Sequence, residues 1–117
     1  MEITNERLND VIVFKLNGRL DSNTSPEFGK KIGQSIKAGS RYIILEFKNL
    51  ENISSAGLRE ILKTAKTLKG MAGKLVLCSM PDYIREVFVV AGFDYILAIV
   101  STMDDALKKM NEISPKP

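Results

Sequence analysis

The sequence contains no histidine and no tryptophan, and it has a single cysteine, Cys78. Histidine is the commonest general base and a frequent zinc ligand, so its absence excludes a serine–histidine–aspartate triad and a Cys/His metal site. One cysteine forms no internal disulfide, which agrees with a reducing compartment. A carboxylate-only metal site remains open, but the acidic residues are scattered along the chain. We therefore expect no metal and no other cofactor.

Long apolar runs are also lacking. No stretch approaches the roughly 20 apolar residues that span a bilayer. The first ten residues, MEITNERLND, lack the basic and apolar regions of a signal peptide. We therefore expect a cytoplasmic protein that makes no membrane contact. With 117 residues, 44% of them hydrophobic, the chain is predicted to form one domain over 1–117, with 113–117 as a frayed tail.

The positive charge of the chain does not indicate nucleic-acid binding. The formal net charge is +3 and the pI is near 9.0. The lysines, however, repeat with helical spacing beside apolar residues, in GKKIGQSIK, LKTAKTLKG and LKKM. Solvated helix faces explain that pattern better than a surface that follows phosphates, and no aromatic residues are interleaved to stack on bases.

The sequence also lacks the motifs of nucleotide-dependent enzymes. There is no phosphate-binding loop of the form Gly-x-x-x-x-Gly-Lys-Ser/Thr and no Gly-x-Gly-x-x-Gly after a strand. No pair of acids is spaced for general acid–base work. We therefore expect a protein without catalytic activity of its own.

Alternating and compact apolar runs predict about five strands. The first two, MEIT and VIVFKL, are separated by a polar stretch with an Asn9-Asp10 turn and ended by Gly18, which predicts an antiparallel hairpin. Three further apolar runs predict strands. YIILEF (42–47) is enriched in aromatic and β-branched residues and suits a strand buried on both faces. KLVLCS is predicted to be another short buried strand and YILAIV (95–100) the last strand.

Four segments between and after these strands have helical apolar spacing. The first is predicted to begin with Ser25 as N-cap and Pro26 at its first position. The second follows Ser54 and Ser55, the third opens with Pro81, and the fourth covers STMDDALKKMNEI. The order β-β-α-β-α-β-α-β-α predicts an α/β fold with a mostly parallel mixed sheet and an N-terminal antiparallel hairpin. The pattern leaves open whether the helices cover one face or both.

The junction between the third strand and the second helix, ISSAGL, is unusual for its paired hydroxyls and small residues. A serine at a helix N-terminus lies near unpaired backbone N–H groups, which favour a phosphate. A phosphate there would disturb a partner rather than the fold, and Ala56 and Gly57 would let a partner approach closely. The simpler interpretation is that Ser54 or Ser55 is only an N-cap.

Four stretches together resemble the STAS domain family, specifically the stand-alone bacterial anti-sigma factor antagonists. They are LNGRLDSNTSPEF, YIILEFKNLENISSAGLREIL, GKLVLCSMPDYIREVF and VVAGFDYILAIVSTMDDAL. The resemblance implies a STAS-like fold and a partner switch. Such an antagonist binds an anti-sigma factor that is also a serine kinase, and so releases a sigma factor. Phosphorylation by that kinase ends the interaction and the sigma factor is sequestered again; a PP2C-type phosphatase resets the switch.

Matching the family's Gly-Leu to Gly57 and Leu58 implies that Ser55 is the phosphorylated serine. The resemblance also implies that Asp21 lies near this serine and assists partner binding, although a turn or cap role is an alternative. Arg59, where a small residue is common in the family, is expected to pair with the phosphate or with an acidic partner, or to be a solvated residue only. The expected partner surface is Asp21, Ser22, Asn23, Ser54, Ala56, Gly57 and Arg59.

Two features depart from the family pattern. The acid that usually precedes the phosphorylated serine is Ser54 here, and the family's second hydroxyl residue is Ala56. The first change removes a negative charge from the predicted partner surface. An alternative function therefore stays open, namely a scaffolding or transport-linked STAS module in which Ser55 is never modified.

Overall fold

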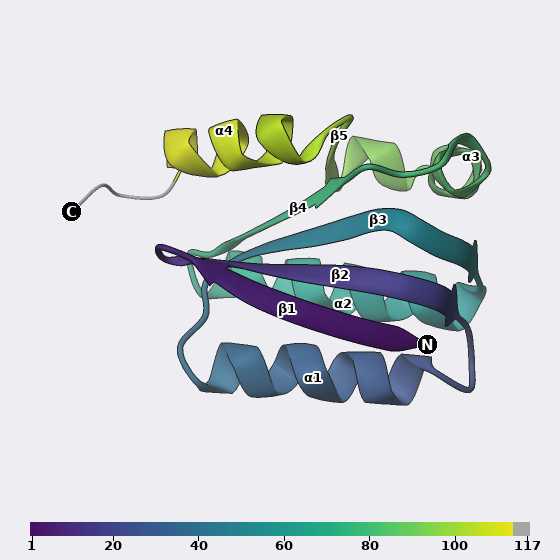
Figure 1. Cartoon of the computed structure of the whole chain (residues 1–117), viewed down its shortest axis with the longest axis horizontal. Helices are drawn as coiled ribbons and strands as arrows, with labels where there is room; N and C mark the ends of the chain where they lie inside the picture. Colours follow the sequence, from purple (N-terminus) through teal and green to yellow (C-terminus); the bar gives the residue numbers. More distant parts are fainter. Residues whose placement is uncertain (114–117) are drawn as a thin grey trace.

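The computed structural model describes residues 1–113, and the remainder of the predicted tail lies outside the described residues. Its five-stranded sheet has the strand order β1-β2-β3-β4-β5 (Figure 1). β1 pairs antiparallel with β2, and the other neighbours pair in parallel. The strands are β1 (Glu2–Leu8), β2 (Val11–Leu20), β3 (Tyr42–Ile53), β4 (Lys74–Cys78) and β5 (Ala98–Val100). The predicted mixed sheet with an N-terminal hairpin is confirmed.

The helices lie on both faces of this sheet, which decides the point that the sequence left open (Figure 1). The three helices that follow β2, β3 and β4 contribute to one apolar cluster, and the last helix contributes to another on the opposite face. They are α1 (Ser25–Lys37), α2 (Ser55–Gly70), α3 (Asp82–Val90) and α4 (Met103–Ile113), with a short 3₁₀ helix η1 (Phe93–Tyr95) before β5. None of the helices within residues 1–113 is both long enough and apolar enough to cross a bilayer.

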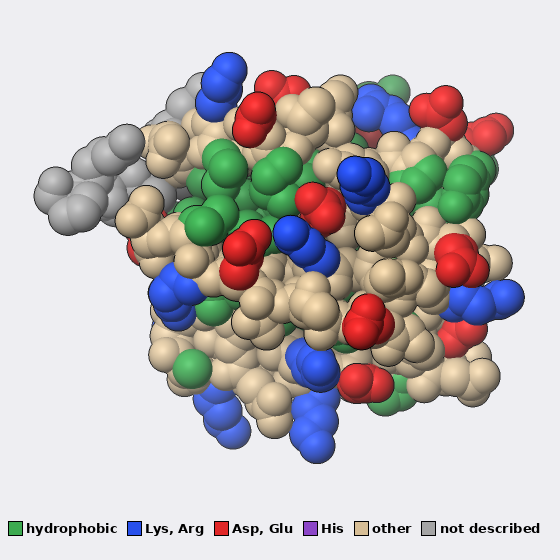
Figure 2. Space-filling view, in the orientation of Figure 1, with side chains coloured by type: hydrophobic (Ala, Val, Ile, Leu, Met, Phe, Trp, Pro, Cys, Tyr) green, Lys and Arg blue, Asp and Glu red, His purple; other side chains and the backbone are tan. Residues whose placement is uncertain are grey.

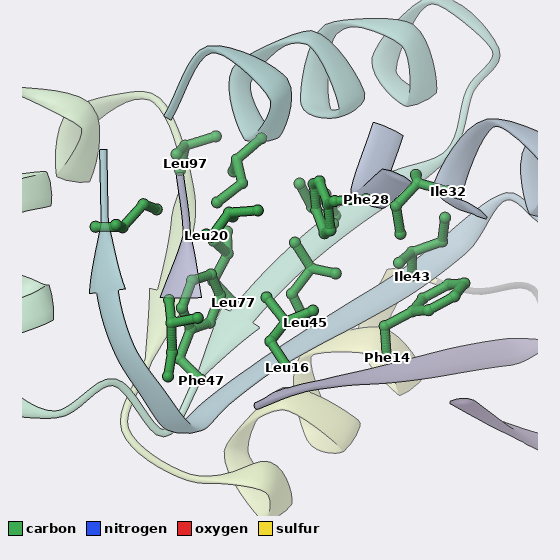
Figure 3. Packing of buried hydrophobic residues seen from close by; sticks show 14 of the residues in the cluster. Phe14, Leu16, Leu20, Phe28, Ile32, Ile43, Leu45, Phe47, Leu77 and Leu97 are labelled. Carbon is green, nitrogen blue, oxygen red and sulfur yellow. The ribbon is translucent and has the colours of Figure 1, made fainter. Parts of the chain in front are cut away.

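Alternation along the central strand explains the two clusters. Ile43, Leu45 and Phe47 of β3 belong to the larger cluster, whereas Ile44 belongs to the smaller one. Successive side chains of a strand point to opposite faces, so a strand with apolar residues on both faces needs a cover on each side. Figure 3 shows the larger cluster, in which residues of the strands converge on Phe28 and Ile32 of α1.

Two strands extend beyond the predicted ends. β2 continues through Gly18, which has a φ of +105°, and its pairing with β3 changes register on both sides of this residue. Such an irregularity absorbs one residue without ending the strand, so the prediction that Gly18 ends it is wrong. β3 likewise runs to Ile53 rather than to residue 47. The two extensions carry the strands to the site described below.

Two other boundaries also differ from the prediction. Residues 95–97 belong to η1 and the turn and bend that follow it rather than to a strand, so β5 is only three residues long. The N-cap of α1 is Thr24 rather than Ser25. Ser25 already lies in the first turn, because its backbone N–H donates to the carbonyl of Asp21 at 2.8 Å.

Candidate functional site

The predicted site residues lie on two neighbouring segments at the carboxyl ends of β2 and β3. Leu20 and Ile53, the last residues of these strands, pair in register. One residue later, the backbone N–H of Ser54 donates to the carbonyl of Leu20 at 2.9 Å. The loop that leads to α1 therefore lies beside the start of α2. In parallel sheets this edge is the usual place of functional loops.

The loop between β2 and α1 is held by its own side chains. One carboxylate oxygen of Asp21 accepts hydrogen bonds from the backbone N–H groups of Asn23 at 3.0 Å and Thr24 at 3.2 Å. The Thr24 hydroxyl accepts from the backbone N–H of Asp21 at 2.9 Å and donates to the carbonyl of Arg19 at 2.8 Å. These reciprocal bonds give Asp21 the turn role that the sequence offered as an alternative, and they fix the loop beside α2.

The electrostatics of Asp21 follow from the same contacts. Partial burial raises the pKa of its carboxyl, but the hydrogen bonds from Asn23 and Thr24 and the nearby Arg19 outweigh this effect, so the pKa is lowered from its ordinary value of 3.8. Nε of Arg19 lies 3.7 Å from Oδ2 of Asp21. Asp21 therefore presents a fixed negative charge near the start of α2 at neutral pH.

The start of α2 leaves its backbone donors largely without side-chain partners. Ser54 occupies the N-cap position, but its side chain makes no capping hydrogen bond; its Oγ is buried without a hydrogen-bond partner among the described residues. A role for Ser54 as a side-chain cap is therefore wrong, although its position is that of the N-cap. Ser55, the first helical residue, is exposed. The first turn of α2 carries no acidic residue, whereas α1, α3 and α4 each carry at least one.

Gly57 lies inside the domain at the point where α2 rests on β2 and β3. A Cβ atom at this position would lie 2.8 Å from Cγ of Leu20, 2.9 Å from its carbonyl oxygen and 3.0 Å from Cγ1 of Ile53. Only glycine fits such a separation. Internal packing thus explains the missing side chain at Gly57, and the predicted contact of this residue with a partner stays a prediction.

An open groove of about 400 Å³ brings parts of the two segments together. It unites three predicted site residues, Ser22, Ala56 and Arg59, whereas Asn23 is exposed on the loop outside it. The sequence analysis did not predict the other lining residues as part of the site; they are Ser25, Pro26, Glu60 and Lys63. Glu60 and Lys63 follow Ala56 at four and seven residues, so helical spacing was the signal that would have placed them on the same side of α2.

The fold agrees with comparisons with known proteins. A family model described as "STAS domain" matches residues 2–106. The chain is 29% identical over 116 residues to BtrV of Bordetella bronchiseptica, which is provisionally named an anti-sigma factor antagonist. The alignment covers 99% of this chain and all of BtrV. A crystal structure of a Thermotoga maritima protein, also provisionally named an anti-sigma factor antagonist, superimposes with a TM-score of 0.88 at 23% identity, covering 97% of this chain and 95% of that one.

A third relative has been solved in two states. The anti-sigma factor antagonist SpoIIAA matches in its unphosphorylated form with a TM-score of 0.76 at 23% identity, covering 96% of this chain and all of that one. The phosphorylated form, from Bacillus, matches with a TM-score of 0.75 at 24% identity, covering 93% and 99%. These likenesses establish the shared fold, and the family model covers most of the sequence. The chain belongs to the STAS domain family.

Proposed function

We propose that the protein is an anti-sigma factor antagonist that binds an anti-sigma factor serine kinase and is switched off by phosphorylation of Ser55. The observation that carries this proposal is the exposed residue Ser55 at the start of α2, beside the fixed loop of Asp21. The names of BtrV and SpoIIAA support the antagonist role, and SpoIIAA has been solved in a phosphorylated form.

The local chemistry favours a phosphate at this position. The backbone N–H groups of the first turn and the positive end of the helix dipole attract anions. Because the first turn of α2 contains no acidic residue, no carboxylate of that turn competes with a phosphate for these N–H groups. Arg59 follows Ser55 by four residues, so its guanidinium can reach a phosphate on the same side of the helix.

The switch acts on the partner rather than on the fold. A phosphate on Ser55 adds about −1.5 to −2 charges to a surface that the kinase has to desolvate on binding. The kinase is then free to hold its sigma factor, and a PP2C-type phosphatase restores the active antagonist. We place this cycle in the cytoplasm, where transcription is controlled.

Intact-mass analysis tests the proposal directly. The protein is incubated with ATP and candidate anti-sigma kinases from the same genome, and the modified residue is then mapped. We expect one added phosphate on Ser55, which Ser55→Ala abolishes. Ser54→Ala is the matched control, because it removes the neighbouring hydroxyl and should leave the modification intact.

The contrary outcome distinguishes the alternative function. If no candidate kinase modifies or binds the protein, the antagonist proposal fails and an unmodified scaffolding or transport-linked module becomes the better account. A phosphate that persists in Ser55→Ala would instead move the site of the switch elsewhere.

A further inference from the structure

Exposed apolar side chains are concentrated in one short segment. Eight large hydrophobic residues are exposed among those that the structure describes, and six of them lie between positions 83 and 96. The most exposed are Tyr95 at 90%, Val90 at 81% and Ile96 at 62%. Figure 2 shows hydrophobic side chains gathered where Figure 1 places α3, apart from a second group where α4 meets the sheet. A contiguous apolar patch on a soluble domain marks an interaction surface more often than chance exposure.

The sequence of α3 explains why the patch exists. Ile84 and Phe88, four residues apart, are buried at 1% and 0% exposure and anchor the helix to the core. Tyr83, Val87 and Val90 form a second stripe with helical spacing on an adjacent face, about 100° around the helix, and are exposed. A helix that covers only one surface needs one apolar stripe, and α3 has two. The outer stripe is left largely to solvent.

The segment is held firmly in place. The ring of Phe88 contacts that of Phe47 edge-on, with centroids 5.8 Å apart, and that of Phe93 at 6.5 Å. The Tyr83 hydroxyl donates to the carbonyl of Leu50 at 3.1 Å, so its exposed ring has a fixed position. A rigid apolar surface loses little side-chain entropy on binding, which favours its use as an interface.

The position of the patch indicates its partner. Leu50 belongs to β3, the strand that ends at Ile53, directly before Ser54 and Ser55. Figure 1 shows α3 and the beginning of α2 at the same end of the molecule. A kinase that reaches Ser55 has to approach this end, and its contact surface has to be larger than one serine.

We propose that the outer stripe of α3 and the residues after it form the apolar part of the kinase-binding surface. We call this surface the α3 platform; it consists of Tyr83, Val87, Val90, Tyr95 and Ile96. The inference rests on the function proposed above and assigns separate roles to the α3 platform and to Ser55. The α3 platform supplies affinity through apolar burial, and Ser55 supplies the charge that breaks the contact. Such a surface requires an apolar patch on the kinase, rimmed by polar groups.

Single charge substitutions test this surface. Val90→Lys and Tyr95→Lys, made separately, place an ammonium group on the α3 platform without touching the buried side of α3. Leu8→Lys and Met71→Lys are matched controls, because these residues are 38% and 42% exposed and lie outside the segment. For each variant, the KM of Ser55 phosphorylation and the Kd for the kinase are measured, and circular dichroism verifies the fold.

We expect Val90→Lys and Tyr95→Lys to raise both constants about tenfold or more, as interface hot spots do, and the two controls to leave them unchanged. Unchanged constants in both platform variants would overturn the inference while leaving Ser55 phosphorylation standing. A wild-type protein that sediments as a dimer, and as a monomer only after Val90→Lys, with kinase binding unchanged, would assign the α3 platform to a second copy and also overturn it. A wild-type protein that no kinase binds or modifies would remove the proposed function and this inference together.

Discussion

Gly57 and Gly33 both lie within helices, but a methyl group would meet different surroundings at each. At Gly57 it would collide with Leu20 and Ile53 at 2.8 to 3.0 Å, whereas at Gly33 no atom of the described residues lies within 4 Å. We expect Gly57→Ala to lower the free energy of unfolding by about 1–3 kcal/mol through overpacking. We expect Gly33→Ala to raise it by about 0.5–1 kcal/mol, because glycine costs a helix interior that much. Urea denaturation of both variants measures the difference, and equal effects would contradict the packing described here.

The carboxyl of Asp21 gives the loop a pH dependence. Its pKa is lowered in the folded protein from the ordinary value of 3.8, so folding favours the charged form. The resulting stabilisation is complete above the ordinary pKa and is lost as the pH falls through the lower pKa of the folded state. We expect wild type to be more stable than Asp21→Asn by a constant amount from pH 7 to about pH 5, and by less below about pH 4. Urea titrations across this range measure it; a gap that widens in acid would refute the lowered pKa.

At the scale of elements, α2 is the helix whose positive end lacks an acid within the described part of the chain. A carboxylate at its first position should therefore be tolerated by the fold. We expect Ser55→Asp to leave the free energy of unfolding unchanged or to raise it by less than about 1 kcal/mol. We expect the same variant to weaken kinase binding, because it mimics part of the phosphate charge. Thermal unfolding and a binding titration measure the two effects.

Ser55→Lys is the control for this prediction. It introduces a charge of opposite sign at the same exposed position, so it should lower the free energy of unfolding by about 0.3–1 kcal/mol. Both effects should diminish in high salt, since exposed charges are screened. A collapse of the fold in Ser55→Asp would contradict the view that the switch acts on the surface.

At the scale of the whole molecule, one sheet supports two apolar clusters. Phe28 of α1 lies in the larger cluster and Met110 of α4 in the smaller one, at 0% and 1% exposure. We expect Phe28→Ala to cost about 3–5 kcal/mol and Met110→Ala about 2–5 kcal/mol. Both should shift one cooperative transition, because the clusters share the strands between them.

Far-UV circular dichroism and tyrosine fluorescence together check this cooperativity. Coincident transitions are expected for wild type and for both variants. An early, separate transition in Met110→Ala would mean that α4 detaches on its own and that the smaller cluster is an independent unit.

Local sequence patterns were sufficient for the order and type of the elements. The compact apolar run in residues 42–47 and the apolar spacing of Phe28, Ile32 and Ile36 depend on neighbours within a few positions, and the structure confirms the strand and the buried helix face that they predict. Strand ends were not predictable in this way. β2 passes Gly18 and β3 passes residue 47 because each pairs with the other, and that pairing joins residues far apart in the sequence.

The candidate site was likewise predictable from the sequence only in part. The sequence by itself determined a serine at a helix start, because a helix N-terminus is a local feature. Only the tertiary structure decided that the loop of Asp21 lies against that helix start and that Gly57 has to be a glycine. It also left the Ser54 hydroxyl without a hydrogen-bond partner among the residues that the structure describes. It also decided that the second apolar stripe of α3 faces solvent. Apolar spacing reveals that a side chain avoids water, but which neighbour covers it, or whether any does, depends on packing between elements.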